Sequence, residues 1–490
     1  MLFTSLIFMV FLPLVLLLYS VLPLRQRWLG LLLASYVFYA ASGLGNAALL
    51  GGVTLAVYGC GWGIARFDAK GARTAFLTVG LVAVLGLMVA FKFYDFLAGE
   101  VEFLLAGAGQ ADPGFALPRL GMSTPAGYSF YAFGAVSYLI DVYVGRLAPE
   151  MHVGKMALYV GYFPKIFAGP IERATAFLPQ VRNPLNVSPE FLVSGLQLIG
   201  WGLFKKVVIA DNLAVLVDRN FAIAAFASPM ELLLSAYFFA FQIYCDFSGY
   251  TDIAIGVSLL FGIKLMENFR RPYFSRSTAE FWGQRWHISL GRWFRDYLYF
   301  PLGGSRVGWL RRYANVMAVF VVSGIWHAGL GYGVGWTFLV WGALNGLYQW
   351  GGMTTASLWR WLAERLPQIA RSRFLLVTRV FLTFHLILVS WVFFRAASVS
   401  EAMLILEKMW TAIGRLPAML TRYPFTAEHY FGIGLIAFLI GVEILDERRS
   451  IWDRLAAVPR AVRWGVYYAG IFALLFLGRW EMREFVYMQF

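Results

Sequence analysis

Long apolar runs recur along most of this 490-residue chain, and they restrict its fold more than any other feature. The first run extends from Met1 to Leu24 and carries no charge before Arg25. We expect it to be a retained span, because it lacks the basic start and small-residue cleavage site of a secretory signal. A transmembrane helix needs about 20 apolar residues, so repeated runs predict a polytopic membrane protein. The further runs lie near residues 29–43, 47–64, 74–91, 130–144, 156–168, 191–216, 230–261, 316–325, 336–351, 374–394, 431–445 and 464–477.

Composition supports the same class. Hydrophobic residues make up 60% of the chain and charged residues 14%, whereas soluble domains carry about 45–50% and about 25%. These figures exclude a disordered chain, a collagen-like repeat and a secreted disulfide scaffold. Cys60 and Cys245 lie in apolar stretches and form neither a metal-binding spacing nor a disulfide framework. We therefore predict an all-α integral membrane protein with roughly 11–13 transmembrane or re-entrant helices and additional interfacial amphipathic helices.

The net charge of +14 has a simple explanation in such a protein. Lys and Arg gather in cytoplasmic loops of polytopic membrane proteins. Arg25 and Arg27 therefore favour a cytoplasmic first loop and leave the N-terminus on the outer side. No basic patch lies on a soluble module, so we expect no nucleic acid as a partner.

Half of this charge is concentrated between Lys264 and Arg312, where ten basic and three acidic residues stand among many aromatic ones. Apolar residues at helical spacing beside Arg indicate an amphipathic helix in the headgroup region. One interpretation is that the segment is a positive-inside loop that only anchors the protein. Alternatively, the segment is a cytoplasmic face that receives an anionic donor, such as a phosphorylated coenzyme or an acidic carrier.

His327 stands in the most suggestive context of the five histidines. It follows Trp326 in an apolar stretch, where an ionisable side chain is costly and is a functional candidate. Imidazole can take a proton from a hydroxyl near neutral pH; a structural hydrogen bond is the alternative. Glycines that would permit close approach surround it at Gly324, Gly329, Gly331, Gly333 and Gly335.

His287 lies forty positions earlier, inside the basic aromatic segment, and the spacing alone does not bring it to His327. We expect the remaining histidines, His152, His385 and His429, to be structural. No Gly-x-Ser-x-Gly motif lies near a histidine. Acyl transfer would therefore use base-assisted direct attack or a nucleophile on another protein.

A second group of polar residues interrupts an apolar run at Tyr244, Asp246, Ser248 and Asp252. These side chains either satisfy one another as a buried network that fixes helices, or they line a polar tunnel. Three further residues complete the substrate-binding or tunnel-lining candidates: Arg295, Asp296 and Trp326.

With these motifs, the chain resembles the membrane-bound O-acyltransferase family, and within it the bacterial branch of alginate O-acetylation proteins. The most specific block reads Gln242-Ile-Tyr-Cys-Asp246-Phe-Ser-Gly-Tyr-Thr-Asp252. The other matching blocks, in order along the chain, are residues 127–143, 163–173, 202–211, 281–290, 293–299, 323–327, 336–342 and 485–490. One departure is a longer spacing between His327 and Trp336.

The resemblance implies a helical ring that is thin at its middle, where donor and acceptor meet through a tunnel. It implies that His327 is the catalytic histidine and that His287 is the second polar residue of the site. It further implies a bacterial inner-membrane enzyme that uses acetyl-coenzyme A as donor, with no metal and no permanently bound cofactor. Its expected partners are membrane lipid, a polysaccharide acceptor and a periplasmic polysaccharide O-acetyltransferase that can complete the transfer.

These observations lead to one main hypothesis, O-acetylation of an exopolysaccharide such as alginate with His327 as general base. The alternatives are D-alanyl transfer from a carrier protein to teichoic acid, and a non-enzymatic transporter component of polysaccharide export. We expect one membrane unit over residues 1–490. Its parts would be N-terminal spans (1–125), a catalytic core (126–352) that contains the basic segment 264–312, and C-terminal spans (353–490).

Overall fold

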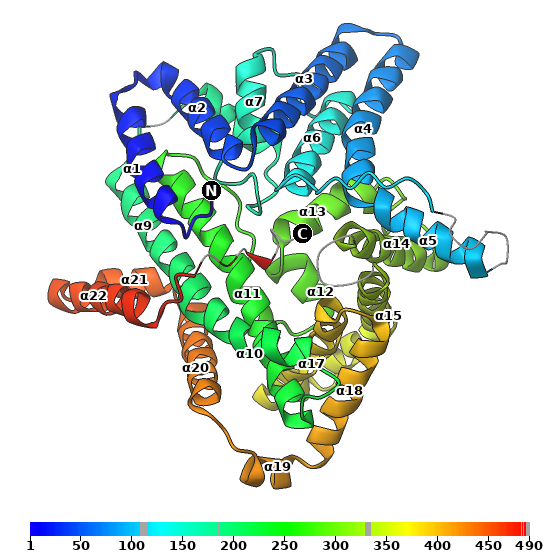
Figure 1. The fold of residues 1–490 in the computed structure, drawn as a ribbon, viewed down its shortest axis with the longest axis vertical. Coiled ribbons are helices and arrows are strands. Elements are labelled where there is room, and N and C mark those ends of the chain that lie inside the picture. Colours follow the sequence, from blue (N-terminus) through cyan, green and yellow to red (C-terminus); the bar gives the residue numbers. More distant parts are fainter. Residues whose placement is uncertain (108–115, 185, 329–334, 482, 484, 487–490) are drawn as a thin grey trace. The chain divides into compact units, whose positions relative to one another are not determined.

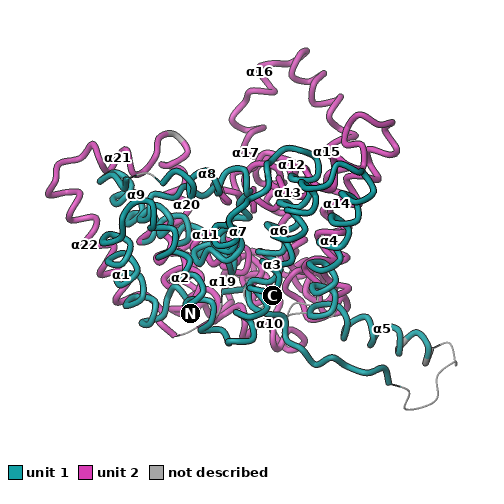
Figure 2. Tube along the Cα trace, turned by 90° about the horizontal axis from the view of Figure 1, so that it is seen from above, with its two compact units in different colours: residues 1–199, 250–266, 484–490 teal, residues 200–249, 267–483 magenta. Residues whose placement is uncertain are grey.

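The computed structural model describes residues 1–107, 116–184, 186–328, 335–481, 483 and 485–486. Every regular element within these ranges is helical, which confirms the all-α prediction (Figure 1). The chain divides into two compact units (Figure 2). Unit 1 comprises residues 1–199, 250–266 and 484–490, and unit 2 comprises residues 200–249 and 267–483.

Unit 1 contains most of the N-terminal helices. In chain order they are α1 (Leu6–Val21), η1 (Leu24–Gln26), α2 (Arg27–Ala40), α3 (Leu44–Arg66), α4 (Lys70–Lys92), α5 (Tyr94–Gly107), α6 (Tyr128–Tyr143), α7 (Val153–Gly161) and α8 (Ala174–Arg182). α3 ends at Arg66 and α4 begins at Lys70, so charged residues mark the end of one apolar run and the start of the next. The short connection between them makes the two helices an antiparallel pair. α6 is buried along almost its whole length and packs against α3, α4, α7 and α8.

Two long helices belong to both units, α9 (Pro189–Leu203) and α11 (Pro229–Leu260). The elements of unit 2 are η2 (Phe204–Ala210), α10 (Asp211–Ala222), η3 (Pro272–Phe274), α12 (Thr278–Glu280), η4 (Phe281–Arg285), α13 (Ile288–Phe294), η5 (Arg295–Tyr299), α14 (Trp309–His327), α15 (Trp336–Arg365), α16 (Pro367–Ala370), α17 (Arg373–Arg395), α18 (Val399–Gly414), α19 (Leu416–Arg422), α20 (Ala427–Arg448), α21 (Ile451–Ala457) and α22 (Arg460–Leu477). η2 is a π-helical turn that joins α9 directly to α10. Such turns leave the regular α-helical hydrogen-bond pattern and occur frequently at functional sites.

Seven helical segments among the described residues are long and apolar enough to cross a bilayer. They are 44–66, 70–92, 189–222, 229–260, 373–395, 427–447 and 460–477. The N-terminal apolar run forms a shorter helix, α1, of 16 residues. The chain is therefore a multi-pass membrane protein, as its apolar runs predicted.

The basic aromatic segment differs from the single amphipathic helix that its residue spacing suggested. It is divided into short helical pieces, from η3 to η5. Several of its large side chains, such as Phe281 and Trp286, are almost fully buried. They pack against residues that come much later in the chain: Trp282, for example, donates its indole hydrogen to Asn345 Oδ1 on α15 at 2.9 Å. Local periodicity could not reveal these partners.

Candidate active site

His327 is the last residue of α14, and close packing between α14 and α15 fixes its position. Where the two helices meet, a Cβ atom on Gly324 would lie 2.4 Å from the carbonyl oxygen of Phe338. A Cβ atom on Gly342 would lie equally close to the carbonyl oxygen of Phe320. Only glycine permits this approach of two backbones. Of the glycines around His327, Gly324 is thus used for helix packing, whereas Gly329, Gly331 and Gly333 lie outside the described residues.

Aromatic rings surround the imidazole of His327, which is 2% exposed. Its ring centroid lies 4.6 Å from that of Trp326, 5.2 Å from that of Trp341 and 5.3 Å from that of Phe394. The C-terminal end of a helix carries partial negative charge, and His327 occupies this position on α14.

His287 occupies a different environment, in the turn before α13. Its backbone is left-handed, with φ of 43°, which is uncommon outside glycine, although Asn, Asp and His adopt it more often than other residues. Its Nδ1 lies 3.1 Å from Asn268 Oδ1. Burial lowers the pKa of His287 from 6.5 to about 3, so its imidazole is neutral near neutral pH.

A layer of tryptophans connects the surroundings of the two histidines. Trp341, which contacts His327, stacks on Trp391 with ring centroids 6.2 Å apart. Trp391 in turn lies 4.9 Å from Trp286, the residue directly before His287. The structure thus places both predicted catalytic histidines along one aromatic layer within unit 2.

A buried charge cluster forms where η2 meets α11 in unit 2. Lys206 Nζ lies 2.6 Å from Asp246 Oδ1 and 2.9 Å from Asp211 Oδ1. The side chains of these three residues are at most 5% exposed. Charged groups are this deeply buried only when they are paired, so the cluster requires all three members. Asp246 therefore belongs to a buried ion-pair network with two charged residues outside the polar group that the sequence singled out, Lys206 and Asp211.

Its neighbours on α11 extend this network. Ser248 accepts a hydrogen bond from Lys205 Nζ at 2.9 Å. The hydroxyl of Tyr244 donates to the carboxylate of Glu443 on α20. Asp252, the fourth residue predicted here, belongs to unit 1 and is half-buried. Their predicted function as tunnel-lining residues stays a prediction.

Some of the basic residues of the 264–312 segment are used internally. Arg271 pairs with Asp446 and Glu447 at the end of α20, and Arg285 pairs with Glu280 and Glu447. In contrast, Arg295 is exposed and pairs only with the adjacent Asp296 in the contacts that the structure defines. The exposed arginines at the C-terminal end of the segment are Arg292, Arg295, Arg306, Arg311 and Arg312.

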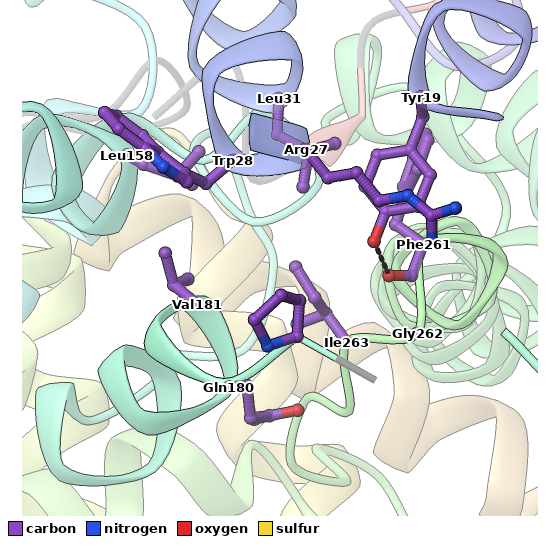
Figure 3. Close-up of a pocket in the computed structure, with 11 residues that line it drawn as sticks. Tyr19, Arg27, Trp28, Leu31, Leu158, Gln180, Val181, Phe261, Gly262 and Ile263 are labelled. Atoms are coloured by element: carbon purple, nitrogen blue, oxygen red, sulfur yellow. Dashed lines mark hydrogen bonds between the residues drawn. The ribbon is translucent and has the colours of Figure 1, made fainter. Parts of the chain in front are cut away.

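A small pocket lies in unit 1, away from these residues in the sequence (Figure 3). Arg27 lies over the ring of Tyr19, whose hydroxyl donates to the carbonyl oxygen of Phe261 at 2.7 Å. The pocket has a volume of about 20 Å³, which accommodates roughly one water molecule and is too small for an acyl donor. Within the described ranges, no three His, Cys, Asp or Glu side chains gather to form a metal site.

Comparisons with known proteins agree with these motifs. The model of the membrane-bound O-acyltransferase family matches residues 150–390. The probable alginate O-acetylase AlgI of Azotobacter vinelandii is 37% identical over 409 residues, which cover 82% of this chain and 76% of that protein. The chain belongs to the membrane-bound O-acyltransferase family. It is an O-acyltransferase, as its motifs implied.

Two further relatives of this O-acyltransferase carry related names. The probable alginate O-acetylase AlgI of Pseudomonas aeruginosa is 36% identical over 416 residues, covering 84% of this chain and 75% of that protein. The peptidoglycan O-acetyltransferase of Helicobacter pylori is 33% identical over 407 residues, covering 78% and 73%. Both matches cover most of the sequence, well beyond the residues around the two histidines.

Sequence reasoning missed several buried polar residues of this O-acyltransferase. Lys206, Asp211 and Glu443 could have been found, because each is a charge inside an apolar run. Asn268 could not. It is a neutral residue in a polar stretch, and only the fold shows that it contacts His287.

Proposed function

We propose that this O-acyltransferase transfers acetyl groups from a cytoplasmic donor for the O-acetylation of an exopolysaccharide such as alginate. The observation that carries the proposal is a buried histidine, His327, at the end of α14 in a chain whose relatives include probable alginate O-acetylases. Acetyl-coenzyme A is the proposed donor. It is a substrate, and nothing in the proposal requires a permanently bound cofactor.

In the proposed reaction, His327 is the general base. It takes the proton of the accepting hydroxyl as the hydroxyl oxygen attacks the thioester carbonyl carbon. The new C–O bond forms, the C–S bond breaks, and the proton passes from the imidazolium to the departing thiolate. The partial negative charge at the end of α14 favours this transient imidazolium.

His287 has a complementary function in this proposal. Its lowered pKa keeps it neutral, so it orients groups at the reaction centre by hydrogen bonding and carries no charge there. Two histidines with different environments can in this way perform different tasks.

The exposed arginines at the C-terminal end of the basic segment are the proposed contact for the phosphates of the donor. Guanidinium groups bind phosphate through paired, charge-assisted hydrogen bonds. Arg306, Arg311 and Arg312 lie close together in the sequence and are exposed at the start of α14. Arg271 and Arg285 are excluded from this function because acidic side chains of the same chain already pair with them.

The proposed setting is a bacterial inner membrane, with the N-terminus on the periplasmic side and the basic segment on the cytoplasmic side. This orientation follows the positive-inside bias. In this scheme the acceptor is the polysaccharide itself or a periplasmic O-acetyltransferase that passes the acetyl group on.

The test is transfer of labelled acetyl from acetyl-coenzyme A by the purified full-length protein in proteoliposomes. We expect His327→Ala to abolish coenzyme A release and acetyl transfer while the protein elutes as a folded species. His385→Ala is the matched control, since this histidine on α17 hydrogen-bonds Tyr237 and should be dispensable for chemistry. Normal transfer by folded His327→Ala protein would disprove the base assignment. Use of a D-alanyl carrier in place of acetyl-coenzyme A would disprove the donor assignment.

A further inference from the structure

Asn268 makes a dense set of contacts with the turn that carries His287. Its side chain is fully buried. Its Oδ1 accepts hydrogen bonds from the backbone nitrogen and the hydroxyl of Ser289, at 3.1 and 2.9 Å. Its backbone carbonyl accepts from the nitrogen of Ile288 at 2.9 Å. One residue thus holds three consecutive positions, 287 to 289.

These contacts determine the orientation of the Asn268 amide. A backbone N–H can only donate, so the amide atom that faces Ser289 N is the oxygen. The same oxygen lies 3.1 Å from His287 Nδ1. An oxygen acceptor at this distance requires that Nδ1 carry the hydrogen. His287 then has its lone pair on Nε2.

The backbone of His287 shows that this arrangement is held against a conformational preference. A non-glycine residue with φ of 43° is strained and persists only where its surroundings over-determine it. The ring of Phe247 meets the imidazole edge-on at 4.7 Å, and the ring of Phe269 lies nearly parallel to it at 6.4 Å. Packing fixes the ring plane, whereas the hydrogen bond from Nδ1 selects the tautomer.

We propose that Asn268 is a positioning residue that fixes His287 in the Nδ1–H tautomer and presents its Nε2 as a hydrogen-bond acceptor to the reacting groups. This inference rests on the proposed function, in which His287 contributes to acetyl transfer. It also defines that contribution. A neutral His287 with its lone pair on Nε2 accepts a hydrogen bond from a hydroxyl, and it cannot donate one from Nε2 to a developing oxyanion.

The test compares two substitutions at Asn268 in the full-length protein with acetyl-coenzyme A as the probe. Asn268→Leu removes the acceptor at similar size, and Asn268→Asp retains it. We expect Asn268→Leu to lower kcat about 10- to 100-fold, the usual effect of removing a group that orients an active-site histidine. KM for acetyl-coenzyme A should stay within about twofold, and Asn268→Asp should recover most of the lost kcat.

A double-mutant cycle separates positioning from a general loss of structure. If Asn268 acts through His287, then Asn268→Leu should have no further effect on kcat in a His287→Ala background. Equal losses in both backgrounds would overturn the proposal, as would a loss confined to KM or a lack of recovery in Asn268→Asp. Asn220→Leu is the matched control, because Asn220 is also buried in unit 2 but hydrogen-bonds Ser235; its kcat should be unchanged.

The outcomes also distinguish this inference from the proposed function. If His287→Ala transfers acetyl at the wild-type rate, the function proposed for His287 fails and this inference fails with it. If His287→Ala is slow but Asn268→Leu is not, only this inference fails. If Asn268→Leu yields no folded protein, the kcat ratio of Asn268→Asp to Asn268→Ala decides, and a ratio near one overturns the proposal.

Discussion

Lys206 Nζ lies 2.6 Å from Asp246 Oδ1, and this ion pair joins the π-helical turn η2 to α11 in the interior of unit 2. Asp211 completes the cluster from the start of α10. Removing one member of a buried ion pair leaves an uncompensated charge, which costs far more than the pair contributes. Each member should therefore have a different and predictable effect on stability.

We expect Lys206→Met to lower the free energy of unfolding by about 3–5 kcal/mol, because it leaves two buried carboxylates without a cation. Asp246→Asn should cost less, roughly 1–3 kcal/mol, since Lys206 still pairs with Asp211 at 2.9 Å. Thermal unfolding in detergent measures both. Lys70→Met, an exposed lysine at the start of α4, is the control and should leave Tm unchanged. Equal Tm for the two lysine variants would contradict this account.

A methyl group at position 324 should disturb the position of His327. In Gly324→Ala the new Cβ would lie 2.4 Å from the carbonyl oxygen of Phe338, so α14 must move away from α15. Such overpacking typically costs about 1–3 kcal/mol. We expect lower stability and a reduced kcat. Gly351→Ala on α15 is the matched control, since its Cβ meets nothing within 4 Å, and it should be neutral or slightly stabilising.

Stability should fall in mild acid because of His287. Its pKa is about 3 in the folded protein and near 6.5 in the unfolded chain. Below pH 6.5 the unfolded chain therefore binds a proton that the folded protein does not. The free energy of unfolding then decreases by up to about 1.4 kcal/mol per pH unit as the pH falls.

The variant His287→Asn isolates this effect, since Asn does not titrate and tolerates the left-handed backbone at this position. Between pH 7.5 and 5, its unfolding free energy should vary less with pH than that of the wild type. Thermal unfolding at a series of pH values measures the difference. Identical pH dependence in the two proteins would show that His287 is not protected from protonation by burial.

The arginines of the basic segment should separate into two classes. Arg285→Gln loses its ion-pair partners Glu280 and Glu447. It should therefore lower Tm, and we expect the free energy of unfolding to fall by roughly 1–3 kcal/mol. Arg311→Gln and Arg312→Gln remove exposed charges and should leave Tm unchanged, but each should raise KM for acetyl-coenzyme A about two- to fivefold. Steady-state kinetics at low and high salt checks this. Unchanged KM in both exposed variants would contradict the proposed donor contact.

The sequence predicted the membrane class and several helices well, for a clear physical reason. α3 and α4 were expected near residues 47–64 and 74–91 and extend over Leu44–Arg66 and Lys70–Lys92. An apolar run that ends at a charge is visible in the sequence itself, because a charged side chain in lipid is costly. The helix ends differed only by a few residues.

The surroundings of the site were not predictable in the same way. The basic segment was expected to form an amphipathic helix. Instead, its aromatic residues are buried by partners far along the chain: Trp286 packs against Trp391, and Trp282 hydrogen-bonds Asn345. The contacts of Asn268 and the ion pairs of Arg271 likewise depend on the fold. A local pattern identified His287 and His327 as candidates and could not show what holds them.

The ion pairs at the end of α20 have a consequence for the order in which the enzyme is assembled. Arg271 and Asp446 are separated by 175 positions, and Arg285 and Glu447 by 162. During synthesis the turn that carries His287 therefore leaves the ribosome long before α20 has been made. A nascent chain that ends before residue 446 can insert its first helices but lacks Asp446 and Glu447, two of the anions that pair with Arg271 and Arg285. Completion of these ion pairs is consequently a late event in biogenesis.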